Sequence, residues 1–252
     1  MSNRIADPLR LAMWSGPRNL STALMRSFAS RGDCRIVDEP FYAAYLVASG
    51  ADHPMRAEVI ASQSSSPTEV ARQCVSGAVD QPIHYQKHMT QHLWPDFDRG
   101  FIRKLTNVFL IREPERVVAS FADRMGDDFD RDAIGFRQQA EVFDYVADHS
   151  GEAPLVVDAA DIRRDPSAVL TELCRRLHIA YTPAMLRWSP GLHPDYGVWA
   201  EHWYGAAFES SGFAPPDDSP YPPLHRKAAE IAEWARPHYD RLAKYRIGGP
   251  SA

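Results

Sequence analysis

The sequence predicts an α/β fold, a three-layer sandwich in which helices flank a central, mostly parallel sheet. Short apolar segments alternate with amphipathic helical patterns along most of the chain, and this alternation indicates βαβ units. Two of the apolar segments end in an Arg and lead directly into a helix, as at the ligand-binding edge of an open sheet. With 252 residues and no internal repeat, the chain can bury one sizeable core, so we expect a single domain over residues 1–252.

The expected strands are compact apolar runs bounded by polar or turn residues. Strands that are buried on both faces of a parallel sheet have this appearance. They cover, in chain order, about residues 9–14, 34–37, 83–87, 106–111 and 155–157.

The expected helices begin at a capping residue or a Pro, or carry apolar residues at helical spacing. Val169, Leu170 and Leu173, for example, share one face of a helix that opens at an Asp-Pro pair. Residues 181–223 are rich in Pro and aromatic side chains and are expected to be mostly loop. The helices cover about residues 19–31, 56–62, 67–78, 114 onward, 131–149, 165–177 and 224–246.

The first candidate site is the strand–turn–helix segment at residues 9–28. An apolar strand runs into a Ser-Gly-Pro turn, after which a helix opens with Asn19, Ser21 and Thr22. The first turn of a helix presents free backbone N–H groups and the positive end of the helix dipole, which favours an anion. Arg18 adds a fixed positive charge and several hydrogen-bond donors. The segment therefore predicts an anion site.

A second segment, residues 107–121, has the same arrangement. Its apolar strand ends at Arg112, Pro114 stands where a helix begins, and Ser120 follows about two helical turns later. Either segment alone could be an ordinary strand–helix junction that binds nothing. Both Arg residues, however, fall at the edge where open α/β sheets bind ligands. Together the segments predict a clamp for a ligand with a phosphate at each end.

The two segments resemble motifs of the sulfotransferases that use 3′-phosphoadenosine 5′-phosphosulfate (PAPS), in particular bacterial and carbohydrate-type members with a P-loop-like fold. The family's first loop, Lys/Arg-Ser-Gly-Thr-Thr-x-Leu, aligns without a gap with the run Arg18-Asn19-Leu20-Ser21-Thr22-Ala23-Leu24. The basic residue, both hydroxyls and the final Leu match. Leu20 replaces the family's Gly, and Asn19 replaces its Ser.

The resemblance implies that Arg18, Ser21, Thr22 and the backbone N–H groups of residues 19–22 surround the 5′-phosphosulfate of PAPS. Leu20 is compatible with this function if its φ is negative, whereas a positive φ would indicate strain and a remodelled site.

The family's second motif is Arg-x-Pro with a Ser eight residues after the Arg, and Arg112, Pro114 and Ser120 match it. The resemblance implies that Arg112 and Ser120 hold the 3′-phosphate. PAPS is then the cofactor and PAP the product. No metal is required, because Arg and Lys can stabilise the charge of the transferring group.

Sulfuryl transfer also needs a base that takes a proton from the acceptor. Resemblance to carbohydrate sulfotransferases implies Glu39 as the base and Lys87 as the contact to the transferring sulfonate. The cytosolic members use a His, for which His88 is the best-placed candidate, ahead of His84 and His92. The alternatives are structural: Glu39 could face a helix dipole, Lys87 could be solvated, and an isolated His is more often a packing residue.

Composition and patterning exclude several other classes of protein. The net charge of −5 argues against a general nucleic-acid binder. The sequence has no apolar run of membrane-spanning length and no signal-peptide pattern, and its three Cys lack metal-ligand spacing. We expect a cytoplasmic enzyme with reduced thiols, and a bacterial form, because many eukaryotic relatives carry a Golgi anchor.

Other functions stay open at this level. The chain lacks a Gly-x-x-x-x-Gly-Lys-Ser/Thr loop, but a small-molecule kinase with an unusual loop, or a non-catalytic nucleotide-binding relative, is an alternative. The acceptor is a small molecule or glycan whose class (sugar, lipid, phenol or amine) the sequence does not identify, and the oligomeric state is equally hidden. The aromatic side chains between residues 188 and 208 either pack in the core or line a ligand pocket.

Overall fold

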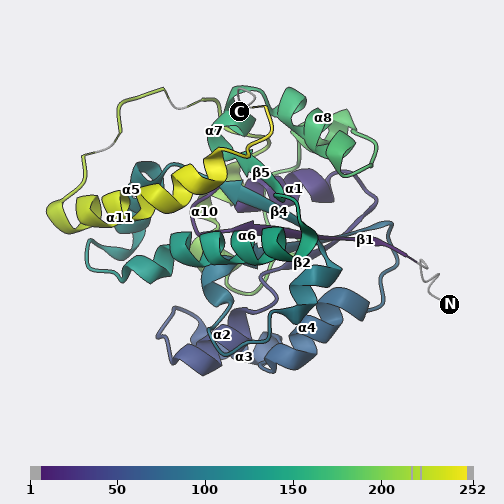
Figure 1. The fold of residues 1–252 in the computed structure, drawn as a ribbon, viewed down its shortest axis with the longest axis horizontal. Coiled ribbons are helices and arrows are strands. Elements are labelled where there is room, and N and C mark those ends of the chain that lie inside the picture. The colour runs from purple at the N-terminus through teal and green to yellow at the C-terminus, as the bar shows by residue number, and fades with distance from the viewer. Residues whose placement is uncertain (1–6, 217, 222, 249–252) are drawn as a thin grey trace.

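The computed structural model describes residues 7–216, 218–221 and 223–248. The described strands form one parallel sheet in the order β2-β3-β1-β4-β5, with β1 at its centre (Figure 1). This confirms the predicted α/β fold. The strands are β1 (Leu9–Ser15), β2 (Cys34–Asp38), β3 (Ile83–Met89), β4 (Thr106–Ile111) and β5 (Leu155–Asp158).

Helices account for most of the remaining chain. The α-helices are α1 (Ser21–Ala29), α2 (Tyr42–Ser49), α3 (Arg56–Ser62), α4 (Pro67–Ser76), α5 (Pro114–Met125), α6 (Phe136–Ser150), α7 (Ala159–Arg164), α8 (Pro166–Arg176), α9 (Ala200–Trp203), α10 (Gly205–Glu209) and α11 (Arg226–Ala243). Short 3₁₀ turns are η1 (Thr90–His92), η2 (Gly100–Lys104), η3 (Arg131–Ile134) and η4 (Pro183–Leu186).

The central strand shows why helices cover both faces of the sheet. Side chains of a strand alternate between faces, and in β1 Leu11 and Met13 enter one core while Ala12 and Trp14 enter the other. All four side chains are fully buried. On the Trp14 side, α11 packs against both α5 and α6 over the sheet (Figure 1). On the other side the core includes residues of α1 and α8.

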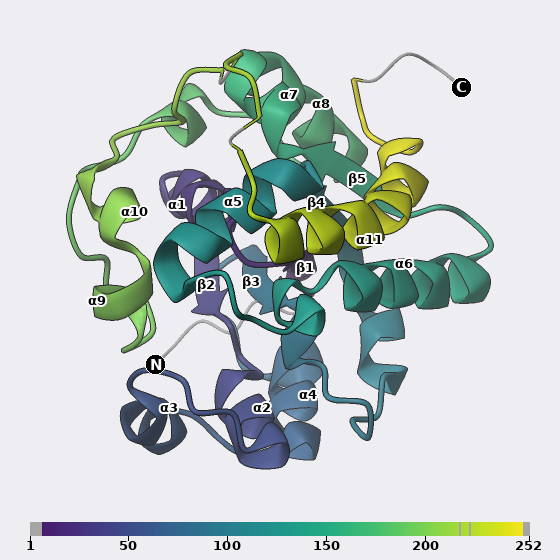
Figure 2. The ribbon, with the colours of Figure 1, turned by 90° about the vertical axis from the view of Figure 1, so that its left-hand side faces the viewer.

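Several elements were not predicted, among them α2, α7 and those within residues 181–223. Residues 159–164 form α7, which was not predicted because it has only 6 residues and ends before the Asp-Pro pair of α8. The predicted loop at 181–223 contains η4, α9 and α10. Figure 2 shows α9 and α10 at one side of the molecule, near α1. That residues 1–252 make one domain stays a prediction, because both ends lie outside the described residues.

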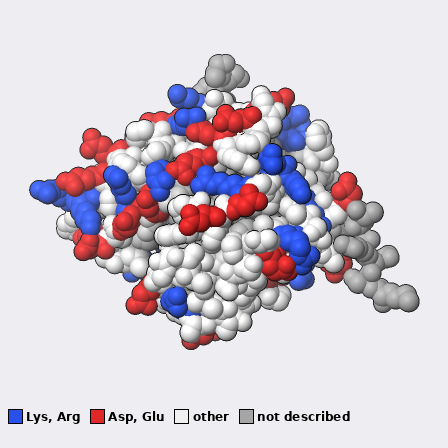
Figure 3. All heavy atoms as spheres, turned by 60° about the horizontal axis from the view of Figure 1, so that its bottom comes forward, with Lys and Arg blue, Asp and Glu red and all other residues white. Residues whose placement is uncertain are grey.

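Charged side chains are interspersed on the face that Figure 3 presents, with acidic and basic groups side by side and a stretch of uncharged surface below them. Within the described residues, no helix is both long and apolar enough to cross a membrane.

Candidate functional site

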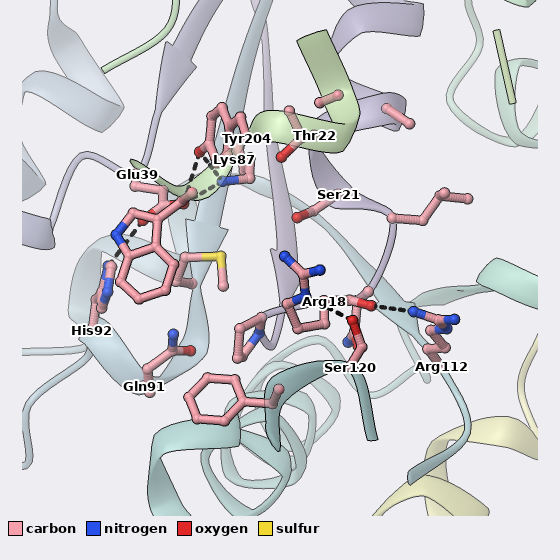
Figure 4. A pocket seen from close by; sticks show the side chains of 18 of the residues that line it. Arg18, Ser21, Thr22, Glu39, Lys87, Gln91, His92, Arg112, Ser120 and Tyr204 are labelled. Carbon is pink, nitrogen blue, oxygen red and sulfur yellow. Dashed lines mark hydrogen bonds and ion pairs between the residues drawn. The ribbon is translucent and has the colours of Figure 1, made fainter. Parts of the chain in front are cut away.

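A cavity of about 350 Å³ lies at the carboxyl ends of β1, β2, β3 and β4. This is the edge at which open α/β sheets bind ligands. The cavity has two sides. One is formed by the loop after β1 together with Arg112 and Ser120, and the other by the residues that follow β2 and β3 (Figure 4).

The loop after β1 leads into α1 without a side-chain cap. Leu20, at the N-cap, makes no side-chain hydrogen bond to the first turn of α1, and Ser21, Thr22 and Ala23 of that turn all line the cavity. Their backbone N–H groups have no partner inside the helix, because the first turn of any helix lacks one. The positive end of the helix dipole points the same way. The loop can therefore receive an anion.

The backbone of this loop is strained. Leu20 has φ 70° and Arg18 has φ 62°, the left-handed region that costs a non-Gly residue about 1–2 kcal/mol. Leu20 thus takes the positive φ that we associated with strain and a remodelled site. Left-handed residues interleaved with right-handed ones turn successive N–H groups toward a common point, as in anion-binding nests. The strain therefore lies where an anion would be held.

Asn19 and Gly16 fix the shape of this loop. Asn19 is buried, and its amide satisfies both of its groups when it accepts from the Gly16 N–H and donates to the Pro17 carbonyl, each at 3.3 Å. Gly16 itself allows a close approach, since a Cβ there would lie 2.4 Å from the Ile134 carbonyl oxygen.

The two predicted anion motifs are joined directly (Figure 4). Arg18 Nε donates to Ser120 Oγ over 2.9 Å, and Arg112 Nη1 donates to the Arg18 carbonyl oxygen over 2.7 Å. Burial lowers the pKa of Arg18, and the nearby Arg124 lowers it further. The guanidinium still stays charged at neutral pH. The structure thus brings Arg18, Ser120 and Arg112 together.

The opposite side of the cavity holds a buried ionic cluster of Asp38, Glu39, Lys87 and Tyr204, which we call the carboxylate–lysine cluster. Lys87 Nζ donates to Asp38 Oδ1 over 3.0 Å and also to Glu39 Oε1. Burial alone lowers the pKa of Lys87, but the two carboxylates outweigh it, so this pKa is raised. Burial raises the pKa of Asp38, against the opposing effect of Lys87. Lys87 is therefore a buried ammonium, not a solvated one.

Tyr204 was named in the sequence only as a member of an aromatic-rich stretch, yet it is central to this cluster. Its hydroxyl lies 2.7 Å from Lys87 Nζ and 2.9 Å from both Asp38 Oδ1 and Glu39 Oε1. Trp199 of the same stretch is also buried, whereas Trp203 lines the cavity. The stretch therefore serves both the core and the pocket.

The three candidate histidines are separated by the structure. β3 extends to Met89, so His88 lies within the strand and points to the face opposite Lys87. His88 is buried, stacks on Trp14 with ring centroids 4.3 Å apart, and does not line the cavity. Burial, together with neighbouring His84, His92 and Lys87, lowers its pKa to about 3. The expectation that His88 is the best-placed His is therefore corrected.

His92 is the candidate histidine that reaches the cavity. Its Nδ1 lies 3.8 Å from Glu39 Oε2 and has no hydrogen-bond partner. Its ring stacks on Tyr42, with centroids 4.4 Å apart. Burial holds the pKa of His92 well below its usual range, so the imidazole is neutral. His84, by contrast, contacts Arg10 and Gln86 away from the cavity.

Aromatic rings enclose this side of the cavity. Those that line it are Tyr42, Tyr45, His53, His92, Trp203 and Tyr204. No group of His, Cys, Asp and Glu side chains within the described residues is arranged to hold a metal ion.

Comparison with known proteins identifies the family. The sulfotransferase domain family matches residues 9–246, and the chain belongs to it. Solved structures with the same fold include the sulfotransferase domain of the Synechococcus PCC 7002 olefin synthase, which is 17% identical with a TM-score of 0.52 over 93% of this chain and 96% of that one. The sulfotransferase domain of the curacin biosynthetic pathway is 14% identical with a TM-score of 0.51, over 93% and 99% of the two chains.

Two curated relatives come from Arabidopsis thaliana. Branched-chain-amino-acid aminotransferase-like protein 1 is 32% identical over 96% of this chain and 43% of its own length. Protein 2 of the same name is 31% identical over 91% of this chain and 40% of its own length. The chain therefore spans less than half the length of the curated relatives that it matches.

Proposed function

We propose that this chain transfers the sulfuryl group of PAPS to a hydroxyl or amine of a small-molecule or glycan acceptor, with PAP as the product. The family and the fold support sulfuryl transfer in general. One observation carries the finer proposal: a single cavity joins an anion-binding side, made by the first turn of α1 with Arg18, Arg112 and Ser120, to a carboxylate that can accept a proton.

PAPS supplies the activated sulfonate when it is bound. The residues present fit such a ligand, because the free N–H groups of the α1 first turn and the charge of Arg18 are matched to one anionic group. Arg112 and Ser120 are proposed to hold the 3′-phosphate, which lies at the other end of the same nucleotide. Asn19 and Leu20 contribute their backbone N–H groups, since the Asn19 side chain is used within the loop.

Glu39 is proposed as the base. Its Oε1 accepts from Lys87 and lies within hydrogen-bond distance of Tyr204, whereas no hydrogen bond among the described residues involves Oε2, which lies 3.8 Å from His92 Nδ1. Of the Glu39 side chain 9% is exposed, compared with 2% for Lys87. Oε2 is therefore the oxygen that can take the acceptor proton. Lys87 is proposed to stabilise the charge that develops on the transferring group, by redirecting one of its three N–H bonds.

A thermal-shift series with PAP, PAPS, ATP and GTP tests the cofactor. A ligand at a hundredfold excess over its Kd stabilises the folded state by about 2.7 kcal/mol, which corresponds to about 5–10 °C for a chain of this size. We expect this shift with PAP and PAPS alone. Shifts with ATP would favour the kinase alternative.

A transfer assay tests catalysis. It measures transfer of radiolabelled sulfonate to a panel of sugars, phenols, lipids and amines. Binding of PAP without transfer to any of them would favour a non-catalytic relative. A cytoplasmic location stays a prediction.

A further inference from the structure

Asp38 and Glu39 are adjacent in the sequence, and their carboxylates contact the same ammonium group, that of Lys87. Adjacent residues of a strand point to opposite faces, yet both carboxylates contact Lys87. The reason is a backbone distortion, since Glu39 follows the last residue of β2 with φ 42°, in the left-handed region. A non-Gly residue keeps such a conformation only where its surroundings hold it. The groups that hold the Glu39 carboxylate therefore matter to the site.

The Tyr204 hydroxyl, which contacts the three other members of the carboxylate–lysine cluster, comes from a distant part of the chain. Tyr204, at the junction of α9 and α10, places its hydroxyl among Asp38, Glu39 and Lys87. Figure 4 shows it beside Glu39 and Lys87. The same hydroxyl accepts from Trp199 Nε1 over 3.1 Å. A phenol has one proton and two lone pairs. Lys87 and Trp199 use the lone pairs, so the proton of Tyr204 is donated to a carboxylate.

This arrangement decides which carboxylate oxygen of Glu39 is held by the cluster and which one can face the acceptor. Lys87 has three N–H donors, and they are directed to Asp38, Glu39 Oε1 and Tyr204. Glu39 Oε1 is thus held by the cluster. The Asp38 side chain is 1% exposed and does not line the cavity, so Glu39 is the carboxylate of the ion pairs that reaches the cavity, beside Lys87.

We propose that Tyr204 is a positioning residue of the sulfotransfer site. With Asp38 it holds Lys87 against Oε1 of Glu39, so that Oε2 is presented to the acceptor. Tyr204 acts through Glu39 and Lys87 and takes no proton from the acceptor. The segment from Gly197 to Tyr204 thereby completes the site, since the Gly197 N–H also donates to Asp38 Oδ2 over 3.2 Å. This inference rests on the proposed function, but its geometric part can be tested without a substrate.

The composition of the chain makes Lys87 observable by NMR. The chain has four Lys residues, and the other three, Lys104, Lys227 and Lys244, are exposed. In protein labelled with ¹⁵N-lysine, a buried ammonium with three acceptors exchanges its protons slowly, whereas exposed ammonium groups exchange them quickly. We expect one ammonium signal near neutral pH, from Lys87.

The test compares Tyr204→Phe with the matched control Tyr196→Phe. The Tyr196 hydroxyl is buried outside the carboxylate–lysine cluster, and its ring packs on Tyr204 with centroids 5.2 Å apart. Both variants remove one hydroxyl and keep the ring. The Lys87 signal should persist in the control and be lost or strongly shifted in Tyr204→Phe. An unchanged signal in Tyr204→Phe would overturn the inference.

Kinetics supply the second readout. The affinity for PAP, measured by calorimetry, should stay within about twofold in Tyr204→Phe, whereas release of PAP from PAPS with water as acceptor should slow by about tenfold to a hundredfold, as for a misplaced reacting group. Wild-type turnover in Tyr204→Phe would contradict positioning.

If Tyr204→Phe does not fold, Asp38→Asn removes another hydrogen-bond acceptor of Lys87. This variant should lose the Lys87 ammonium signal and turn over PAPS more slowly. An unchanged signal and unchanged turnover would again overturn the inference. Wild-type protein that neither binds PAP nor turns over PAPS would refute the proposed function, and the NMR comparison would still decide the positioning role.

Discussion

Arg18 donates a hydrogen bond from its guanidinium to Ser120, which lies 102 residues further along the chain. Arg112 closes the link from the other side by donating to the Arg18 carbonyl oxygen. The loop after β1, Arg112 and the middle of α5 are therefore one unit before any ligand binds. A nucleotide that reaches both motifs meets donors whose positions are already fixed, which lowers the entropy cost of binding.

Arg112→Ala should weaken PAP binding by about tenfold to a hundredfold. The expected loss is that of a charge-assisted hydrogen bond, about 1.5–3 kcal/mol. Calorimetric titration with PAP measures it, and adenosine 5′-phosphosulfate, which lacks the 3′-phosphate, is the matched ligand control. Its affinity should change little. Equal losses for both ligands would show instead that Arg112 acts by supporting the Arg18 loop.

Glu39→Gln should lower the turnover of PAPS by about a hundredfold to ten-thousandfold, the usual effect of removing a base. Gln keeps the size of the side chain and cannot take the proton, so PAP affinity should hold. Transfer of radiolabelled sulfonate measures the rate, with Glu58→Gln on the exposed face of α3 as the control. Full activity in Glu39→Gln together with loss in His92→Ala would move the role of base to His92.

The sequence was informative wherever function depends on a local pattern. Both Arg motifs, the strand that ends before Glu39 and the position of Lys87 could be read from short segments, because a strand followed by a helix is encoded within about twenty residues. The predicted bounds of β4 and α3 agree with the structure. The catalytic and binding roles of these residues stay predictions.

Two features could not be read in this way. The third strand was expected to end at Lys87, so His88 was placed just after it; the strand continues to Met89, and alternation then turns His88 into the core. Tyr204 contacts Glu39 across 165 residues of sequence. No local pattern encodes such a contact, because it depends on how a stretch rich in Pro and aromatic residues folds over the sheet edge.

Gly16→Ala should destabilise the protein by about 1–3 kcal/mol, because overpacking a tight contact forces the backbone to shift. An added Cβ would lie 2.4 Å from the Ile134 carbonyl oxygen, and backbone cannot move aside as easily as a flexible side chain. Urea unfolding measures the loss, and PAP affinity should fall with it because the anion loop begins at this turn. Gly205→Ala is the control: a Cβ added there would meet no atom within 4 Å, so stability should be unchanged or slightly higher. Equal stabilities of the two variants would show that the Gly16 turn has room to relax.

Acidification from pH 7 to pH 5 should destabilise the fold through His88. In the unfolded chain a His has a pKa near 6.5, whereas burial lowers the pKa of folded His88 to about 3. Between these values the unfolded state binds more protons than the folded state, so the free energy of unfolding falls as the pH falls. At pH 5 the loss from one such group is about 2 kcal/mol. Asp38 acts in the opposite direction, because its raised pKa favours the folded state as the pH falls.

A comparison of variants isolates the His88 contribution from that of Asp38. Urea unfolding of the wild type and of His88→Gln at both pH values gives the difference in stability for each protein, and His149→Gln, at an exposed position of α6, is the control. The pH 7 to pH 5 loss should shrink by about 2 kcal/mol in His88→Gln and stay at the wild-type value in His149→Gln. The Asp38 term is common to all three proteins and cancels. An unchanged loss in His88→Gln would mean that His88 takes up its proton in the folded protein, and hence that its stacking on Trp14 tolerates a charge.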